Sequence, residues 1–255
     1  MTKTLSIGIE NDSSVNYVTA NIYSSRELEQ LCSELADYII QKYDKYLLVW
    51  IINHNYCYFN KTEKKEVYRL SEEMKALSNK DSLQYNRQKF NIEQALFDYF
   101  YNEQETTLIL DGFVRFRLDS YIRELEYIID KAVDEYLLKQ EYRDFIVLLK
   151  YCVNTQRSMI DTVHVLANRD HTYQITDEQY RSISSDQFVS LQEEYELNAI
   201  NDDDFLISTL ITLAPKQVVL HHKNRIENKN LLHTIEQVFE DRVIICDGCC
   251  FCDSK

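Results

Sequence analysis

The first hundred residues alternate between strand-like and helical patterns of apolar side chains. Residues 6–9 and 15–23 flank a polar turn at residues 11–14, which predicts a β-hairpin. Residues 24–27 have the form of a helix capping box, and apolar side chains then recur at helical spacing, at Leu28, Leu31, Cys32, Leu35 and Ile39. The uninterrupted apolar run at residues 46–52 predicts a strand that is buried on both faces.

Helical periodicity dominates the middle of the chain. One helix is marked by four apolar side chains, at Val67, Leu70, Met74 and Leu77, and a more polar helix is expected over residues 83–101. Apolar residues then recur in steps of three and four over residues 118–137, and a second stripe of this kind covers residues 142–153. We predict an αα-hairpin or one kinked helix here, bridging the two halves of the protein.

The last hundred residues predict a small α/β unit. A hairpin is expected from residues 162–166 and 173–176. Two further strands are expected at residues 217–220 and 242–245, with a helix at residues 230–239 between them. Three aspartates before residue 205 complement the positive end of a helix dipole, so an additional helix is expected at residues 205–214.

Together these patterns predict a mixed α/β fold of the α+β type. We expect an N-terminal α/β lobe at residues 1–104, bridging helices at residues 105–158, and a C-terminal α/β domain at residues 159–255 that ends in a cysteine cluster. A length of 255 residues suits one large domain or two small ones, because domains commonly span about 100–200 residues.

Composition narrows the classes of function. The chain has only three glycines, and no G-x-G-x-x-G, P-loop, G-x-S-x-G or H-E-x-x-H motif, so no nucleotide cofactor is expected. The formal net charge of −14 disfavours nucleic acid as a partner. The run at residues 46–52 is far shorter than the roughly 20 residues that span a bilayer, and no apolar leader precedes it. We therefore expect a cytoplasmic protein without a membrane span, whose partner is another protein of unspecified identity.

Four of the seven cysteines fall within seven residues, at Cys246, Cys249, Cys250 and Cys252. Disulfides are not expected in a chain of this size with an odd cysteine count and no export signal. The spacing of Cys246, Cys249 and Cys252 allows three thiolates to converge on one ion, with zinc as the first candidate. If the strands before His221 and Cys246 are parallel neighbours, both residues lie at one sheet edge, which nominates His221 or His222 as a fourth ligand.

Two other interpretations of this cluster stay open at this point. One is a solvent-facing tail of reduced cysteines, beside histidines that simply end a strand. The other is thiol redox chemistry, which is weakened because the Cys246-x-x-Cys249 motif is not expected to open a helix, and a helix N-terminus lowers a thiol pKa.

Three further groups of residues carry weaker hypotheses. Arg115 and Arg117 could bind a phosphate or an acidic partner, although such residues more often cover apolar surface or pair with carboxylates. The aspartates at residues 202–204 are better explained as helix capping than as a calcium loop. His164 and His171 lie near aspartates, but no nucleophile motif accompanies them.

Several segments resemble the YtxC-like family of sporulation proteins. The likeness covers roughly residues 105–252 and rests on residues 112–118 (GFVRFRL), 130–136 (DKAVDEY), 141–151 (EYRDFIVLLKY), 210–215 (LITLAP) and the Cys246-x-x-Cys249-x-x-Cys252 motif. The resemblance implies a cytoplasmic protein of endospore-forming bacteria and implies no reaction. The preferred hypothesis is a non-enzymatic accessory protein with a structural or sensing metal site. The alternative is a metal- or thiol-dependent enzyme that uses the same cluster.

Overall fold

The computed structural model describes residues 3–11, 14–78, 82–101, 105–170, 172–183 and 201–253. The chain divides into two compact units, Met1–Lys139 and Gln140–Lys255, which we call unit 1 and unit 2. Each unit has a hydrophobic core of its own. No helix in the described part of the chain combines the length and apolar character needed to cross a bilayer. The mixed α/β class predicted from the sequence is confirmed.

Unit 1 opens with the predicted hairpin. Strand β1 (Lys3–Asn11) pairs antiparallel with β2 (Ser14–Ile22), and the later strand β3 (Glu105–Ile109) pairs parallel with β1 on its other side. Leu5, Ile7 and Leu108 point into the core from this sheet. The serine cap of the predicted capping box is confirmed at the start of the next helix, because the Glu27 N–H donates to the Ser24 hydroxyl at 3.2 Å. The Glu27 carboxylate accepts from the Tyr23 N–H at 2.8 Å instead of from Ser24.

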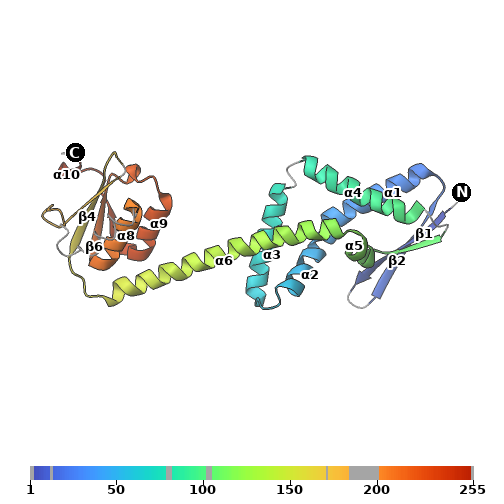
Figure 1. Cartoon of the computed structure of the whole chain (residues 1–255), viewed down its shortest axis with the longest axis horizontal. Helices are drawn as coiled ribbons and strands as arrows, with labels where there is room; N and C mark the ends of the chain where they lie inside the picture. Colours follow the sequence, from blue (N-terminus) through green and yellow to red (C-terminus); the bar gives the residue numbers. More distant parts are fainter. Residues whose placement is uncertain are drawn as a thin grey trace. The chain divides into compact units, whose positions relative to one another are not determined.

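The rest of unit 1 is helical (Figure 1). Its helices are α1 (Ser25–Tyr38), the π-turn η1 (Ile39–Tyr43), α2 (Asp44–Asn55), α3 (Lys61–Ser78), α4 (Ser82–Tyr101), α5 (Leu110–Arg117) and the first part of α6 (Asp119–Thr155). The helices expected after residue 24, over the apolar residues from Val67 to Leu77, and over residues 83–101 are thus confirmed as α1, α3 and α4.

The strand predicted at residues 46–52 is wrong, because this run lies within helix α2. Its buried side chains are Leu47, Leu48, Ile51 and Ile52, whereas Tyr46 and Val49 are exposed. Burial therefore follows the 3.6-residue helical period. The sequence could not reveal that period, because the residues on the exposed side of the run are also apolar.

Helix α6 is one continuous helix of 37 residues, so the predicted αα-hairpin is wrong. Of the alternative, one kinked helix, the single helix is confirmed. Neither glycine nor proline interrupts residues 119–155, and residues 137–141 (LLKQE) are strong helix formers. Leu125, Ile129 and Val133 of α6 belong to the core of unit 1. Ile146 and Val153 belong to the core of unit 2.

Unit 2 is built on a four-stranded sheet in the order β5–β4–β6–β7. Its strands are β4 (Thr162–Ala167), β5 (Tyr173–Thr176), β6 (Gln217–His221) and β7 (Val243–Ile245), and its helices beyond α6 are α8 (Asp202–Leu213), α9 (Lys229–Phe239), α10 (Cys250–Asp253) and the short turns η3 (Lys223–Arg225) and η4 (Glu240–Arg242). The hairpin, both later strands and the two helices predicted here are confirmed. β4 runs parallel to β6, and β6 runs parallel to β7.

The two faces of the unit 2 sheet differ in character. Val163, Val165, Val218 and Leu220 are buried in the core that helices α8 and α9 share, and Figure 1 shows these helices beside the sheet. Side chains alternate along a strand, so His164 and His221 lie on the opposite face. That face carries the candidate site.

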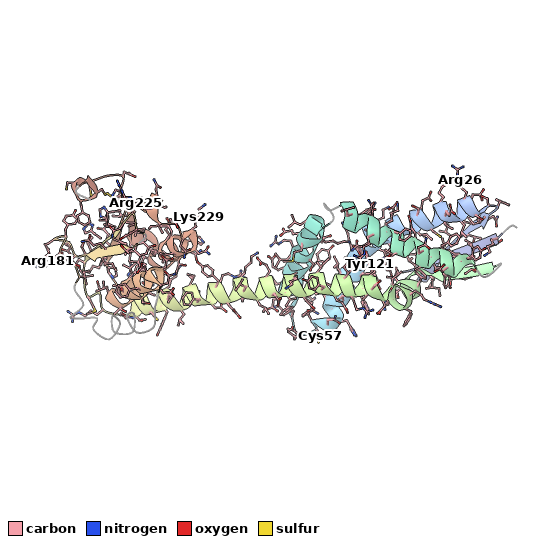
Figure 2. The ribbon with its side chains drawn as sticks, turned by 45° about the horizontal axis from the view of Figure 1, so that its top comes forward. Arg26, Cys57, Tyr121, Arg181, Arg225 and Lys229 are labelled. Carbon is pink, nitrogen blue, oxygen red and sulfur yellow. The ribbon has the colours of Figure 1, made fainter. Side chains whose placement is uncertain are left out.

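A buried polar contact ties three helices of unit 1 together. The Asp44 carboxylate, only 2% exposed, accepts a hydrogen bond from the Tyr121 hydroxyl and forms an ion pair with Lys75. The three residues come from α2, α6 and α3, and Figure 2 labels Tyr121 on α6. A buried charge without its partner is strongly destabilising, so this contact specifies how the three helices pack.

We predict that Asp44→Ala lowers the free energy of unfolding of unit 1 by about 3–5 kcal/mol, because Lys75 then stays buried without its partner. The measurement is urea unfolding followed by fluorescence of Trp50, the one tryptophan of the chain, which lies in α2. Glu73→Ala is the matched control: its pair with Arg69 is exposed, so the loss is at most about 1 kcal/mol. Equal losses in the two variants would contradict this assignment.

Candidate metal centre

Two parallel strands bring the first two residues of the site to one edge of the unit 2 sheet. His221 is the last residue of β6, and Cys246 directly follows β7. The Cys246 N–H donates to the Leu220 carbonyl at 2.9 Å, which extends the pairing of the two strands by one residue. The parallel arrangement expected from the sequence is therefore present, and it places an imidazole beside a thiol.

A sharp turn then returns the chain across the polar face of the sheet. Gly248 has a φ of +134°, a backbone conformation that residues with a Cβ rarely adopt. The short helix α10 follows, and its first turn is closed by the Cys252 N–H, which donates to the Cys249 carbonyl at 2.9 Å. This turn carries the thiols of Cys249 and Cys252 to the side chain of His221.

The four side chains converge on one point. His221 Nδ1 lies 3.3 Å from Cys252 Sγ and 3.6 Å from Cys249 Sγ. Cys252 Sγ lies 3.8 Å from Cys246 Sγ and 3.7 Å from Cys249 Sγ. All four ligand atoms lie within 4.8 Å of one another.

These separations match a tetrahedral zinc site. With Zn–S bonds of about 2.3 Å and a Zn–N bond of about 2.0–2.1 Å, tetrahedral angles place sulfurs about 3.8 Å apart and nitrogen about 3.6 Å from sulfur. The sulfur separations are nearly twice the roughly 2.05 Å of a disulfide bond. The donor set of one imidazole and three thiols is one that zinc commonly takes, so the residues fit the ion.

His221 is held by a second histidine. Its Nδ1 faces the thiols, and its Nε2 lies 3.0 Å from His164 Nδ1. With a metal ion on Nδ1, the proton of this imidazole would lie on Nε2 and would be donated to His164 Nδ1. Contacts of this kind fix the tautomer and orientation of a ligating histidine.

Aromatic rings cover the pair of histidines. The Phe251 ring packs edge-on against His221, with centroids 5.3 Å apart, and stacks on the Tyr180 ring at 4.5 Å. The Tyr180 ring in turn lies 4.7 Å from that of His164. His221 and Cys252 are 2% and 7% exposed, so the centre of the cluster is shielded from water.

The electrostatics of the cluster suit a cation. Burial, and then the neighbouring His164 and His222, hold the pKa of His221 below its ordinary value, which keeps the imidazole neutral at pH 7. The Cys252 backbone N–H lowers the pKa of the Cys249 thiol. Burial raises the pKa of the Cys252 thiol to about 11, so this thiol needs a cation beside it to ionise near neutral pH.

The structure distinguishes between the residues nominated from the sequence. Cys246, Cys249, Cys252 and His221 come together, whereas His222 lies outside the group. His222 directly follows β6 in a left-handed backbone conformation with a φ of +52°. Cys250 is exposed, because the side chains of consecutive residues diverge. The expectation that no helix follows Cys249 is wrong, since α10 begins at Cys250.

His164, Tyr180 and Phe251 were not linked to the cluster by sequence reasoning. For His164 a signal was present in the strand register. His164 pairs with Val219 of the neighbouring parallel strand, and Val219 lies on the same face of the sheet as His221, so His164 lies on that face too. Tyr180 and Phe251 lie in non-strand segments whose course the sequence pattern does not determine. His171 lies outside the described residues.

Two of the other candidates, Arg115 and residues 202–204, have structural roles. Arg115 forms an ion pair with Asp111 at 2.9 Å and lies over the Trp50 ring at 4.3 Å, so it covers apolar surface as its commoner role predicts. Residues 202–204 form the first turn of α8, where their charges complement the helix dipole, and the cap itself is the Asn201 side chain. The Asp203 carboxylate also accepts a hydrogen bond from the Tyr173 hydroxyl at 2.6 Å.

Comparison with known proteins shows the family of this chain. The family model of the YtxC-like family matches residues 29–244. The chain belongs to the YtxC-like family. It is also 26% identical over 208 residues to the uncharacterised protein YtxC of Bacillus subtilis (strain 168), which covers 79% of this chain and 70% of that relative. No solved structure matches the chain.

The YtxC-like match differs in extent from the resemblance found in the sequence. It begins at residue 29, well before the first motif at residue 112, so it includes the helices of unit 1. It ends at residue 244, so it includes His164 and His221 but none of the three clustered cysteines. The geometry of the cluster is therefore an observation on this chain and does not rest on its membership of the YtxC-like family.

The turn at Gly248 provides a test of the cluster's geometry. No atom lies within 4 Å of the position of an added Cβ, so Gly248→Ala acts through backbone strain, which costs about 1–2 kcal/mol. We predict that Cys252 is then alkylated about five- to thirtyfold faster by iodoacetamide in the presence of a chelator, because a penalty of one or two kcal/mol changes the open population by this factor.

Gly112→Ala is the matched control for this experiment. Gly112 lies in helix α5 with an ordinary φ, and an added Cβ there also meets nothing within 4 Å. Alanine is favoured over glycine in a helix, so this variant leaves the labelling of Cys252 unchanged. The same labelling rate in Gly248→Ala and wild type would contradict the role of the turn.

Proposed function

We propose that this protein carries a structural zinc ion, bound by His221, Cys246, Cys249 and Cys252, that stabilises unit 2 of a non-enzymatic accessory protein. The observation that carries the proposal is the convergence of four ligand atoms within 4.8 Å, because the separations of Cys252 from the other three, and of His221 from Cys249, are close to those in a tetrahedral zinc site. One ion bound there joins the end of β6 to the segment after β7 and to α10.

Four protein ligands favour a structural role over a catalytic one. A catalytic zinc keeps an open position for water or substrate, whereas a structural zinc is closed by four protein side chains. The aromatic cover from Phe251 and the burial of Cys252 further limit access to the ion. The alternative, a metal- or thiol-dependent enzyme, needs one of the four ligands to leave the ion and an approach for substrate.

A zinc ion also explains why a buried thiol with a raised pKa lies beside a neutral imidazole, which an inert cysteine tail does not explain. Residues 250–253 form only one helical turn, and Cys252 is 7% exposed with a raised thiol pKa. A tail of reduced cysteines has no reason to gather three sulfurs and a neutral imidazole at one point. A divalent cation supplies that reason, because it binds thiolates and stabilises their ionised form.

We predict that protein purified without a metal-binding tag carries one zinc per chain, measured by elemental analysis. Cys246→Ser and Cys252→Ser lose the ion, whereas Cys250→Ser keeps it, because Cys250 is exposed and outside the group. Binding of the ion is coupled to folding, so the first two variants lower the melting temperature of unit 2. The Trp50 fluorescence transition reports unit 1 and stays unchanged.

Two results would contradict this proposal. One is wild-type protein without stoichiometric metal together with a Cys252→Ser variant that melts like wild type, which would make the cluster an inert tail. The other is loss of zinc in Cys250→Ser to the same degree as in Cys252→Ser, which would place the ion elsewhere.

The biological setting that we propose is sporulation in the cytoplasm of an endospore-forming bacterium, with a protein as the partner. The support is membership of the YtxC-like family, which the sequence motifs had associated with sporulation, and the relative from Bacillus subtilis. We predict that deletion of the gene in its own host lowers the yield of heat-resistant spores and leaves the growth rate unchanged. A defect of equal size in vegetative growth would point to a housekeeping role.

A further inference from the structure

A cleft lies in unit 1 between α4 and the junction of α5 and α6. The cleft has a volume of about 680 Å³, which is within the range of small-molecule sites. One wall is formed by α4, and the other by the end of α5 and the first turns of α6. All of its lining residues belong to unit 1.

The cleft is lined by arginines in a protein whose net charge is strongly negative. Arg87 from α4 and Arg117 from the end of α5 both line it, and neither has a hydrogen-bond or ion-pair partner in the described part of the chain. A third arginine, Arg123, is paired with Asp119, and one carboxylate, Glu124, also lines the cleft. Two guanidinium groups from different elements therefore remain available to one ligand.

A buried amide supplies an independent indication that something binds here. Gln88 lines the cleft, is only 8% exposed, and its Oε1 has no hydrogen-bond partner within the described residues. A buried polar atom without a partner is costly, and a ligand that brings its own polar group removes that cost. The neighbouring Leu83, Ile92 and Ala95 offer apolar contact for a short carbon skeleton.

We propose that this cleft binds a small phosphate ester that carries a hydroxyl group. Guanidinium groups bind phosphate oxygens through paired, charge-assisted hydrogen bonds, and two of them suit the several oxygens of a phosphate group. Leu118 and Ser120 at the start of the 37-residue helix α6 line the same cleft, so the positive end of a long helix dipole adds to the attraction. The Gln88 amide then meets the hydroxyl of the ligand.

The test is isothermal titration of the full-length protein with glycerol 3-phosphate and with methyl phosphate at constant ionic strength. We expect saturable binding of both probes, with glycerol 3-phosphate the tighter. The double variant Arg87→Gln/Arg117→Gln weakens both by about 100-fold, because each charge-assisted contact contributes about tenfold or more. Gln88→Leu weakens glycerol 3-phosphate about five- to tenfold and leaves methyl phosphate unchanged, because only the hydroxyl contact is lost.

Arg26→Gln is the matched control. Arg26 is an exposed arginine on α1 of the same unit, and Figure 2 shows its side chain pointing away from the protein. This variant leaves the affinity for both probes unchanged. Absence of saturable binding up to about 10 mM of either probe overturns the proposal, as does a double variant that binds as tightly as Arg26→Gln.

Discussion

The parallel pairing of β6 with β7 is the constraint on which the candidate metal centre depends. Parallel strands end at the same sheet edge, so a histidine that ends one and a cysteine that follows the other become neighbours, although 24 residues of chain separate them. The crossover through α9 keeps the two strands parallel, since its buried side chains belong to the core beneath the sheet. The hydrophobic packing of one face of the sheet thus positions the histidine and cysteine side chains on the other face.

The segment after β7 completes the site through local conformation. Gly248 adopts a positive φ just before Cys249, and the bond from the Cys252 N–H to the Cys249 carbonyl then holds these two residues on one turn at the start of α10. His164 orients His221 from the neighbouring strand, while Phe251 and Tyr180 cover both rings. The YtxC-like match covers both histidines and ends at residue 244, before the three thiols of the cluster.

The cluster could be predicted from the sequence because that prediction needs only the direction of the two strands and the spacing of the cysteines. The sequence could not decide between His221 and His222, since the choice depends on where the strand ends and on the left-handed conformation of His222. The prediction for residues 46–52 was wrong because every residue of this run is apolar, so the helical period could not be recognised. For residues 118–153 the sequence left two forms open, and the structure has one continuous helix. The cleft beside Arg117 could not be predicted from the sequence either, because Gln88 and Arg87 approach it from a separate helix.

X-ray absorption at the zinc edge, on protein purified without a metal-binding tag, identifies the ligand atoms of the ion. We expect three sulfur neighbours at about 2.3 Å and one nitrogen neighbour at about 2.0–2.1 Å, with the outer-shell scattering of a single imidazole. Loss of that imidazole signal in His221→Ala, with the sulfur shell retained, would assign the nitrogen to His221. A wild-type spectrum without three sulfur neighbours, or one whose imidazole signal persists in His221→Ala, would contradict the account.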